Sequence, residues 1–248
     1  MMWLPPAFFA TALLYASVGF GGGSTYNALL ALAGFDYRLL PVVSLCCNVI
    51  VVTGSTVRFT RAGVVPWRRA LILSLIAAPL AYLGGLTPIK QATFLVLLGI
   101  SLVAAGIALF LPRASEGESE PTSLARWMPL AVAPLGYLAG LVGIGGGIFL
   151  APLLHFTRWA NARAIAATTS LFILINSVSG LIGQLAKNGV DAFSAALTGA
   201  LPLLIAVVLG GQLGSVLALR WLPERVIRML TAALTIWAGG QLLYRQWF

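Results

Sequence analysis

The chain has 248 residues, of which 60% are hydrophobic and only 8% are charged. A soluble domain of this size carries about 25% charged residues, because a hydrated surface must cover its core. The composition therefore excludes most soluble enzymes, secreted disulfide scaffolds and disordered chains. It predicts a protein embedded almost wholly in a lipid bilayer.

Fifteen Lys and Arg against six Asp and Glu give a formal net charge of +9. The basic residues fall between apolar runs, which is typical of topology determinants and not of a nucleic-acid surface. Cys46 and Cys47 are adjacent within an apolar run and the chain has one histidine. We therefore expect no disulfide framework, no metal site and no cofactor. The first residues lack the basic stretch of a signal peptide, so we expect them to be part of the fold.

A transmembrane helix needs about 20 mainly apolar residues. Long uncharged runs occur eight times in the chain. Each is expected to be helical, because a backbone in lipid must satisfy its own hydrogen bonds, so the predicted fold class is an all-α polytopic membrane protein. The runs are Met1–Phe35, Leu39–Val57, Ala70–Ile89, Gln91–Pro112, Trp127–Thr157, Ala164–Ala186, Ala192–Leu219 and Met229–Tyr244.

The segment 113–126 resembles a soluble linker and divides the chain into a first repeat, 1–112, and a second repeat, 127–248. The glycine cluster at 21–23 recurs at 145–147, and later landmarks recur at a constant offset of 126. Their order and spacing predict an internal duplication. The matched landmarks are Ser44-Leu45 with Ser170-Leu171, Gly54 with Gly180, Gly63 with Gly189, and Gly84-Gly85 with Gly210-Gly211.

The basic residues indicate how the two repeats are oriented. If all eight runs cross the membrane, Lys and Arg divide eight to seven between its sides, which is no bias. If the first and fifth runs enter and leave on one side, the division becomes eleven to four, a positive-inside signal. Each half then has three crossings, so the repeats are predicted to be inverted, with the acidic linker cytoplasmic and both termini periplasmic. Leaving the second and sixth runs uncrossed instead gives ten to five.

Clusters of consecutive glycines interrupt the first and fifth runs. Such glycines weaken a helix by about 1 kcal/mol each, and broken helices at membrane depth are tolerated where they line a protein cavity. The helix that resumes after each break presents free N–H groups and a positive dipole end, which favour an anion. The predicted anion-binding glycines are Gly21, Gly22, Gly23, Gly145, Gly146 and Gly147. The alternative is that these glycines only let helices pack closely.

Polar side chains near the clusters complete the predicted substrate site. Neutral hydroxyls and amides can hydrogen-bond an anion, although they can equally bond to neighbouring helices. Arg58 is a candidate for the cytoplasmic mouth, with an interfacial arginine as the alternative. The candidates after the first cluster are Ser24, Thr25 and Asn27, those on the second run are Ser44, Asn48 and Arg58, and those on the sixth run are Thr169, Ser170 and Asn176.

No carboxylate lies inside an apolar run. A carboxylate proton relay or sodium site is therefore not expected. The sequence accordingly predicts passive anion flux that the membrane potential drives outward.

The motif GFGGGSTYNALLAL, its partner GLVGIGGGIFLAPLL and the duplicated halves resemble the TauE/SafE family of bacterial membrane permeases. The resemblance covers essentially the whole chain. It implies an inner-membrane exporter of small anions such as sulfite, sulfoacetate or related sulfonates, and not an enzyme. The second repeat has Ile148-Phe149 where Ser24-Thr25 stand in the first, so an anion site would depend more on the first half.

The expected partners are therefore a small anionic substrate and the lipid bilayer, with a homodimer as an option. The sequence leaves one alternative open: a membrane-integral enzyme or an accessory subunit without transport activity.

Overall fold

The computed structural model describes residues 2–18, 20–110, 122–217 and 224–247. All regular secondary structure in these ranges is helical, as the apolar runs predict. Residues 113–121 of the predicted linker lie outside the described ranges, and residues 123–126 belong to a short helix. The elements are α1 (Leu4–Val18), α2 (Gly23–Leu32), α3 (Leu40–Arg61), α4 (Trp67–Leu86), α5 (Gln91–Phe110), η1 (Ser123–Trp127), α6 (Met128–Val142), α7 (Gly147–Phe156), α8 (Ala162–Leu217) and α9 (Glu224–Trp247).

Among the described residues, five helical segments are long and apolar enough to cross a membrane. The 22 residues of α3 correspond to about 33 Å, which matches the hydrocarbon thickness of about 30 Å. The fold is therefore that of a polytopic membrane protein. The five segments are Leu40–Arg61, Trp67–Leu86, Gln91–Phe110, Ser123–Val142 and Ala162–Gly214.

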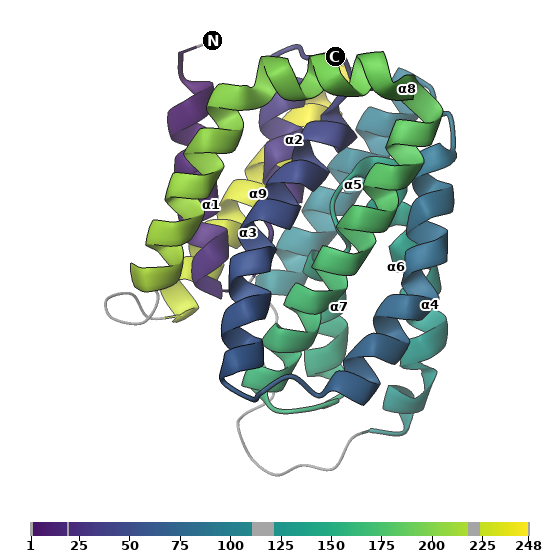
Figure 1. Ribbon diagram of the computed structural model, residues 1–248, viewed down its shortest axis with the longest axis vertical. Helices are drawn as coiled ribbons and strands as arrows, with labels where there is room; N and C mark the ends of the chain where they lie inside the picture. Colours follow the sequence, from purple (N-terminus) through teal and green to yellow (C-terminus); the bar gives the residue numbers. More distant parts are fainter. Residues whose placement is uncertain (1, 19, 111–121, 218–223, 248) are drawn as a thin grey trace.

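The first and fifth apolar runs are each broken into two helices that double back (Figure 1). α1 starts at the end of the molecule that carries both termini, and α2 returns to that end after the glycine break. In the second hairpin the Thr122 N–H donates to the Thr157 carbonyl at 3.1 Å, so the start of η1 and the end of α7 are adjacent. α6 therefore ends inside the protein, although η1 and α6 together have the length of a span. The inverted relation of the two halves stays a prediction.

α8 combines the sixth and seventh apolar runs. Its 56 residues are interrupted at Gly189, whose φ of 79° and ψ of 166° are not helical. In Figure 1, α8 rises from the linker end, bends at the opposite end and descends beside α1. Gly63, the landmark matched to Gly189, also has a positive φ, 65°, between α3 and α4. This shared role in a turn favours the predicted duplication.

Glycines let the first arm of each hairpin pack directly on a long helix. A Cβ added to Gly140 of α6 would overlap the Ala81 carbonyl of α4. In the other hairpin, a Cβ added to Gly214 of α8 would overlap the Leu13 carbonyl of α1. Only glycine allows so close an approach of the backbones. These contacts fix the depth at which each glycine break lies.

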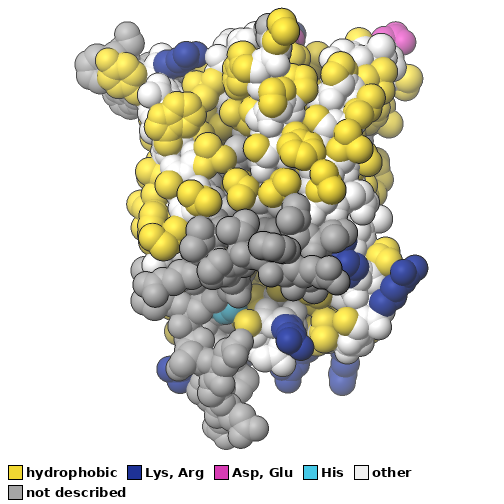
Figure 2. Space-filling model, turned by 90° about the vertical axis from the view of Figure 1, so that its left-hand side faces the viewer, with side chains coloured by type: hydrophobic (Ala, Val, Ile, Leu, Met, Phe, Trp, Pro, Cys, Tyr) yellow, Lys and Arg dark blue, Asp and Glu magenta, His cyan; other side chains and the backbone are white. Residues whose placement is uncertain are grey.

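Basic side chains gather at one end of the molecule, and apolar side chains cover much of the remaining surface (Figure 2). The acids whose side chains are described, Asp36 and Asp191, lie at the other end, in the loop before α3 and after the Gly189 bend. Arg113, Arg220, Arg225 and Arg228 lie outside the described side chains. At the linker end are Arg58, Arg61, Arg68, Arg69, Arg126, Arg158 and Arg163; at the end with the termini are Arg38, Lys90, Lys187 and Arg245.

The first hairpin can be tested by cysteine labelling in a Cys46→Ala, Cys47→Ala background. Single cysteines at Trp3 and Asp36, which flank the hairpin, should react with an impermeant maleimide from the same side of the membrane. A cysteine at Ser123 should react from the opposite side. A permeant maleimide, which should label all three positions, is the control. Labelling of positions 3 and 36 from opposite sides would show that the first run crosses.

Candidate functional site

Glycines in the left-handed conformation form the two helix breaks. Gly22, the N-cap of α2, has a φ of 83°, and Gly146, the N-cap of α7, has a φ of 76°. Residues with a Cβ rarely adopt this conformation, which explains why the helices are interrupted at glycines. The first N–H groups of α2 and α7 have no intrahelical partners, because a helix leaves them free. Two helix N-termini therefore begin inside the protein.

The two breaks meet through side chains of the first half. The Ser44 hydroxyl lies 2.6 Å from the Gly23 carbonyl oxygen and 3.0 Å from that of Gly143. Asn27 Nδ2 donates to the carbonyls of Val142 and Gly143 at 2.7 and 3.1 Å. Since Gly143 ends α6, these contacts tie the second break to α2 and α3. The carbonyls of Val142 and Gly143, which are freed where α6 ends, thereby gain hydrogen bonds inside the protein.

Asn48 of α3 lies between the two breaks. The Gly23 N–H donates to Asn48 Oδ1 at 2.8 Å, so the other end of this amide, Nδ2, takes no part in the bond. A Cβ on Gly21 or Gly23 would overlap the Asn48 amide, and a Cβ on Gly145 would stand 2.7 Å from Nδ2. The glycines therefore provide the space that Asn48 occupies. Nδ2 is buried and has no hydrogen-bond partner among the described residues.

The first part of α8 brings two further hydroxyls to the second break. A Cβ on Gly145 would stand 3.0 Å from Ser177 Oγ, and one on Gly147 would stand 2.9 Å from the Thr169 methyl group. Both hydroxyl oxygens are buried and lack partners within the described ranges. Unpaired polar groups of Asn48, Thr169 and Ser177 thus lie around the two glycine breaks, together with the unpaired Tyr26 hydroxyl and Asn27 Oδ1 on α2. Each buried donor without a hydrogen-bond partner lowers the stability of the folded state by about 1–3 kcal/mol. A polar ligand that bonds to such a donor would recover this free energy.

The surroundings of the breaks carry no formal charge. Segments 1–35, 39–57, 127–157 and 164–186 contain no Asp, Glu, Lys or Arg. Asn48, Thr169 and Ser177 are all 0% exposed, so the site is closed to solvent in this conformation. Within the described residues no group of three or more His, Cys, Asp or Glu side chains could hold a metal ion. The chemistry available is hydrogen bonding by neutral groups.

Most predicted site residues lie at or beside the breaks. Thr25 differs from the others, because its hydroxyl forms a hydrogen bond with Tyr15 OH at 2.8 Å and not with a group at the breaks. Asn176 Nδ2 donates to the Phe172 carbonyl of its own helix, and its Oδ1 is buried without a partner in the described structure. The structure brings together Gly21, Gly23, Asn27, Ser44, Asn48, Gly145, Gly147 and Thr169, and it places Gly22, Gly146, Ser24 and Ser170 in buried positions on the same elements.

Arg58 lies apart from the other predicted residues. It is ten residues beyond Asn48 on α3, or about 15 Å along the helix axis. Its Nη2 donates to Ser55 Oγ at 3.2 Å, and the side chain is half-buried. Arg58 therefore makes no contact with the glycine breaks in this conformation.

Sequence reasoning left Ser177 and Gly143 out of the predicted site. The predicted residues Thr169 and Asn176 are seven positions apart on the sixth run. The stripe with a spacing of four, from Thr169 through Ile173 to Ser177, is the one that faces the second break. Both spacings lie on one helical face, so only packing against Gly145 separates them.

A sequence model of the family described as sulfite exporter TauE/SafE matches residues 4–242. A probable membrane transporter protein of Sinorhizobium fredii, y4hK, is 33% identical over 245 residues, covering 96% of each chain. A probable membrane transporter protein of Methanocaldococcus jannaschii, MJ0441, is 25% identical and covers 92% of this chain and 90% of its own. YunE of Bacillus subtilis, likewise a probable membrane transporter protein, is 24% identical, with coverages of 92% and 91%. No solved structure matches the chain.

The contacts to Gly143 predict a measurable coupling between Asn27 and Ser44. Asn27→Ala and Ser44→Ala should each lower the free energy of unfolding by about 1–3 kcal/mol, because each removes a buried hydrogen bond. Since both side chains bond to the same carbonyl, the double variant should deviate from additivity. Thr53→Ala, which removes an exposed bond to its own helix, is the control. Unfolding of the purified protein in detergent measures all four variants; effects equal to the control would contradict the bridging role.

Proposed function

Because the chain belongs to the sulfite exporter TauE/SafE family, we propose that this membrane transporter exports small anions, sulfite or organosulfonates, across the bacterial inner membrane. The observation that carries the proposal is the meeting of two buried helix N-termini with unpaired polar groups of Asn48, Thr169 and Ser177. Helix N-termini stabilise anions through free N–H groups and the helix dipole. An oxyanion placed there would accept hydrogen bonds that the protein leaves unmade.

Neutral donors suit a transporter better than a fixed positive charge would. A cationic side chain would bind an anionic substrate strongly in a low dielectric and slow its release. Neutral N–H and O–H donors would bind the anion more weakly and allow it to leave. The proposed site is composed of the glycines Gly21, Gly22, Gly23, Gly145, Gly146 and Gly147 with Ser24, Asn27, Ser44, Asn48, Thr169, Ser170, Asn176 and Ser177. We place Thr25 in its supporting network and Arg58 on the route to the cytoplasm.

Transport requires that the closed site open to each side in turn. The hairpins α1–α2 and α6–α7 each present one break to the site, so their movement would uncover it. The positive-inside rule and the basic end of the molecule favour a cytoplasmic linker and periplasmic termini. The opposite starting ends of the two hairpins in Figure 1 support inverted repeats, the arrangement in which many transporters bind substrate at the repeat interface. A homodimer stays a prediction.

The binding role of the unpaired donors can be separated from their structural role. Asn48→Asp keeps the acceptor for the Gly23 N–H but replaces the free donor with an acceptor, so it should abolish sulfite transport. Ser177→Ala should weaken substrate affinity about tenfold to a hundredfold, because one hydrogen bond to a charged ligand is worth about 1.5–3 kcal/mol. Radiolabelled sulfite uptake into proteoliposomes measures both.

Asn188→Ala is the matched control, because its amide bonds to Gln184 farther along α8. Melting temperatures of all variants show whether they are folded. Normal transport by Asn48→Asp and Ser177→Ala would place the anion site elsewhere. Absence of flux in the unmodified protein would favour the accessory-subunit alternative.

The absence of charged groups around the breaks predicts uncoupled transport. A membrane potential drives a monovalent anion with about 2.3 kcal/mol per 100 mV, which is a gradient of about fiftyfold. A potassium–valinomycin potential should therefore set the direction of sulfite flux without any proton or sodium gradient. Flux that ignores the potential but follows one of those gradients would contradict the mechanism, and Asp36 and Asp191 would then be tested first.

A further inference from the structure

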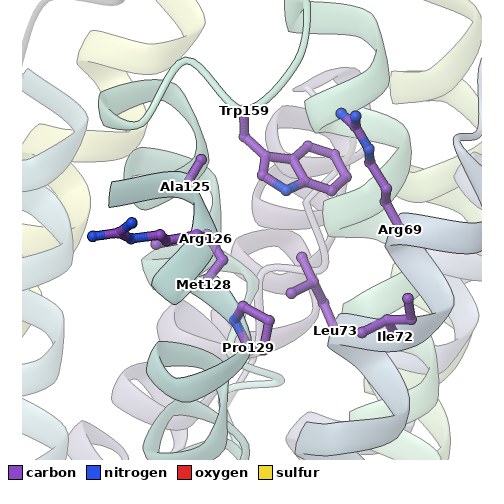
Figure 3. A pocket seen from close by; sticks show the side chains of 8 residues that line it. All are labelled: Arg69, Ile72, Leu73, Ala125, Arg126, Met128, Pro129 and Trp159. Carbon is purple, nitrogen blue, oxygen red and sulfur yellow. The ribbon is translucent and has the colours of Figure 1, made fainter. Parts of the chain in front are cut away.

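A groove of about 290 Å³ lies at the linker end of the molecule, apart from the glycine breaks. It is formed where the start of α4 meets η1, the start of α6 and the loop after α7 (Figure 3). Met128, in its wall, precedes the break at Gly143 by fifteen residues, or about 22 Å along α6. The lining residues are Arg69, Ile72, Leu73, Ala125, Arg126, Met128, Pro129 and Trp159. The groove is therefore a second site, separate from the proposed anion site.

The groove lies at the depth of the lipid headgroups. Trp67 and Trp127, at the start of α4 and the end of η1, are 46% and 53% exposed. Exposed tryptophans are typical of the interface between membrane and water. From Ile72 an exposed apolar face continues along α4 through Leu75 and Ile76, toward the middle of the bilayer. An acyl chain can therefore leave the groove along a surface that already faces lipid.

Two arginines border the apolar floor. The guanidinium carbon of Arg69 lies 5.9 Å from the centre of the buried Trp159 ring, and that of Arg126 lies 5.6 Å from the Trp127 ring. In Figure 3 the Arg69 side chain extends beside Trp159, and Arg126 extends outward from the rim. Neither has a carboxylate partner among the described residues. The stacked guanidinium groups keep their N–H groups available for a phosphate.

The charges around the groove favour an anionic ligand. Among the acids whose side chains the structure describes, Asp36 and Asp191 both lie at the opposite end of the molecule, whereas Arg61 and Arg68 add positive charge near this one. A free phosphate ion would use the arginines but leave the apolar wall of Leu73, Met128 and Trp159 unused. A zwitterionic lipid would bring a positive choline or amine toward the arginines. The ligand that matches both the wall and the rim is a phospholipid with net negative charge.

We propose that this groove binds an anionic phospholipid of the cytoplasmic leaflet, with its phosphate beside Arg69 at the rim that also carries Arg126, and its first acyl carbons over Leu73 and Ile72. Because the lipid contacts α4, η1 and the α7–α8 loop together, it links the base of the second hairpin to a long helix. Its binding stabilises the folded state by mass action.

The test titrates the purified protein, in an uncharged detergent, with dioleoylphosphatidylglycerol, dioleoylphosphatidylcholine and inorganic phosphate. Bound lipid is counted by native mass spectrometry, and the melting temperature is followed in parallel. We expect phosphatidylglycerol to bind at one site and raise the melting temperature, and the other two probes to have little effect. Arg69→Gln with Arg126→Gln should weaken this binding about thirtyfold, since each basic residue near an anionic lipid contributes about 1 kcal/mol.

Arg61→Gln with Arg68→Gln is the matched control, because it removes the same charge at the same end outside the groove. Ala125→Phe fills the groove while keeping both arginines and should also prevent binding, which keeps the test decisive if the double glutamine variant misfolds. Equal loss in both arginine pairs would reduce the effect to general surface charge and overturn the proposal. Equal binding of phosphatidylcholine, or equal stabilisation by phosphate alone, would overturn it as well.

Discussion

Backbone groups that leave a helix at membrane depth must find new partners, because lipid offers none. In this protein the end of α6 frees the carbonyl of Gly143 at the second break. The Ser44 hydroxyl lies within hydrogen-bond distance of this carbonyl and of the Gly23 carbonyl at the first break. Asn27 and Asn48 supply the remaining contacts from the first half of the chain. The backbone groups at each break therefore depend on hydrogen bonds from outside their own hairpin. The close helix packing at Gly140 and Gly214 has the same effect, since it holds both hairpins at the depth where these bonds form.

The same constraint separates two kinds of polar chemistry in the molecule. Around the breaks the available groups are neutral, which avoids the cost of burying an ion and leaves the proposed anion weakly held. Guanidinium groups are found instead at the linker end, where Arg69 and Arg126 are exposed beside tryptophan rings. The described part of the molecule thus has a neutral centre and a basic end.

Much of the helical architecture could be predicted from the sequence, because lipid imposes helix on every long apolar run. The glycine clusters also indicated where the first and fifth runs would break. Side-chain partners were harder to predict. The predicted site includes Asn176 but not Ser177, since residues seven and eight positions from Thr169 share one helical face and only the approach of Gly145 distinguishes them. Arg58 was included because it ends the same helix as Asn48, yet it bonds to Ser55 near the linker end.

The sequence by itself determined the membrane setting, the helical class, the positions of the breaks and the absence of charge around them, since each follows from composition or from the local cost of glycine in a helix. Only the tertiary structure decided that the two breaks face each other across Asn48, that one amide hydrogen-bond donor stays unpaired there, and that Arg69 and Arg126 border one groove. Contacts of this kind join residues more than a hundred positions apart along the chain, as in the pair of Asn27 with Gly143, which are 116 positions apart. Local hydrophobicity and helix propensity carry no information about such pairs, because the pairs form only when the hairpins pack.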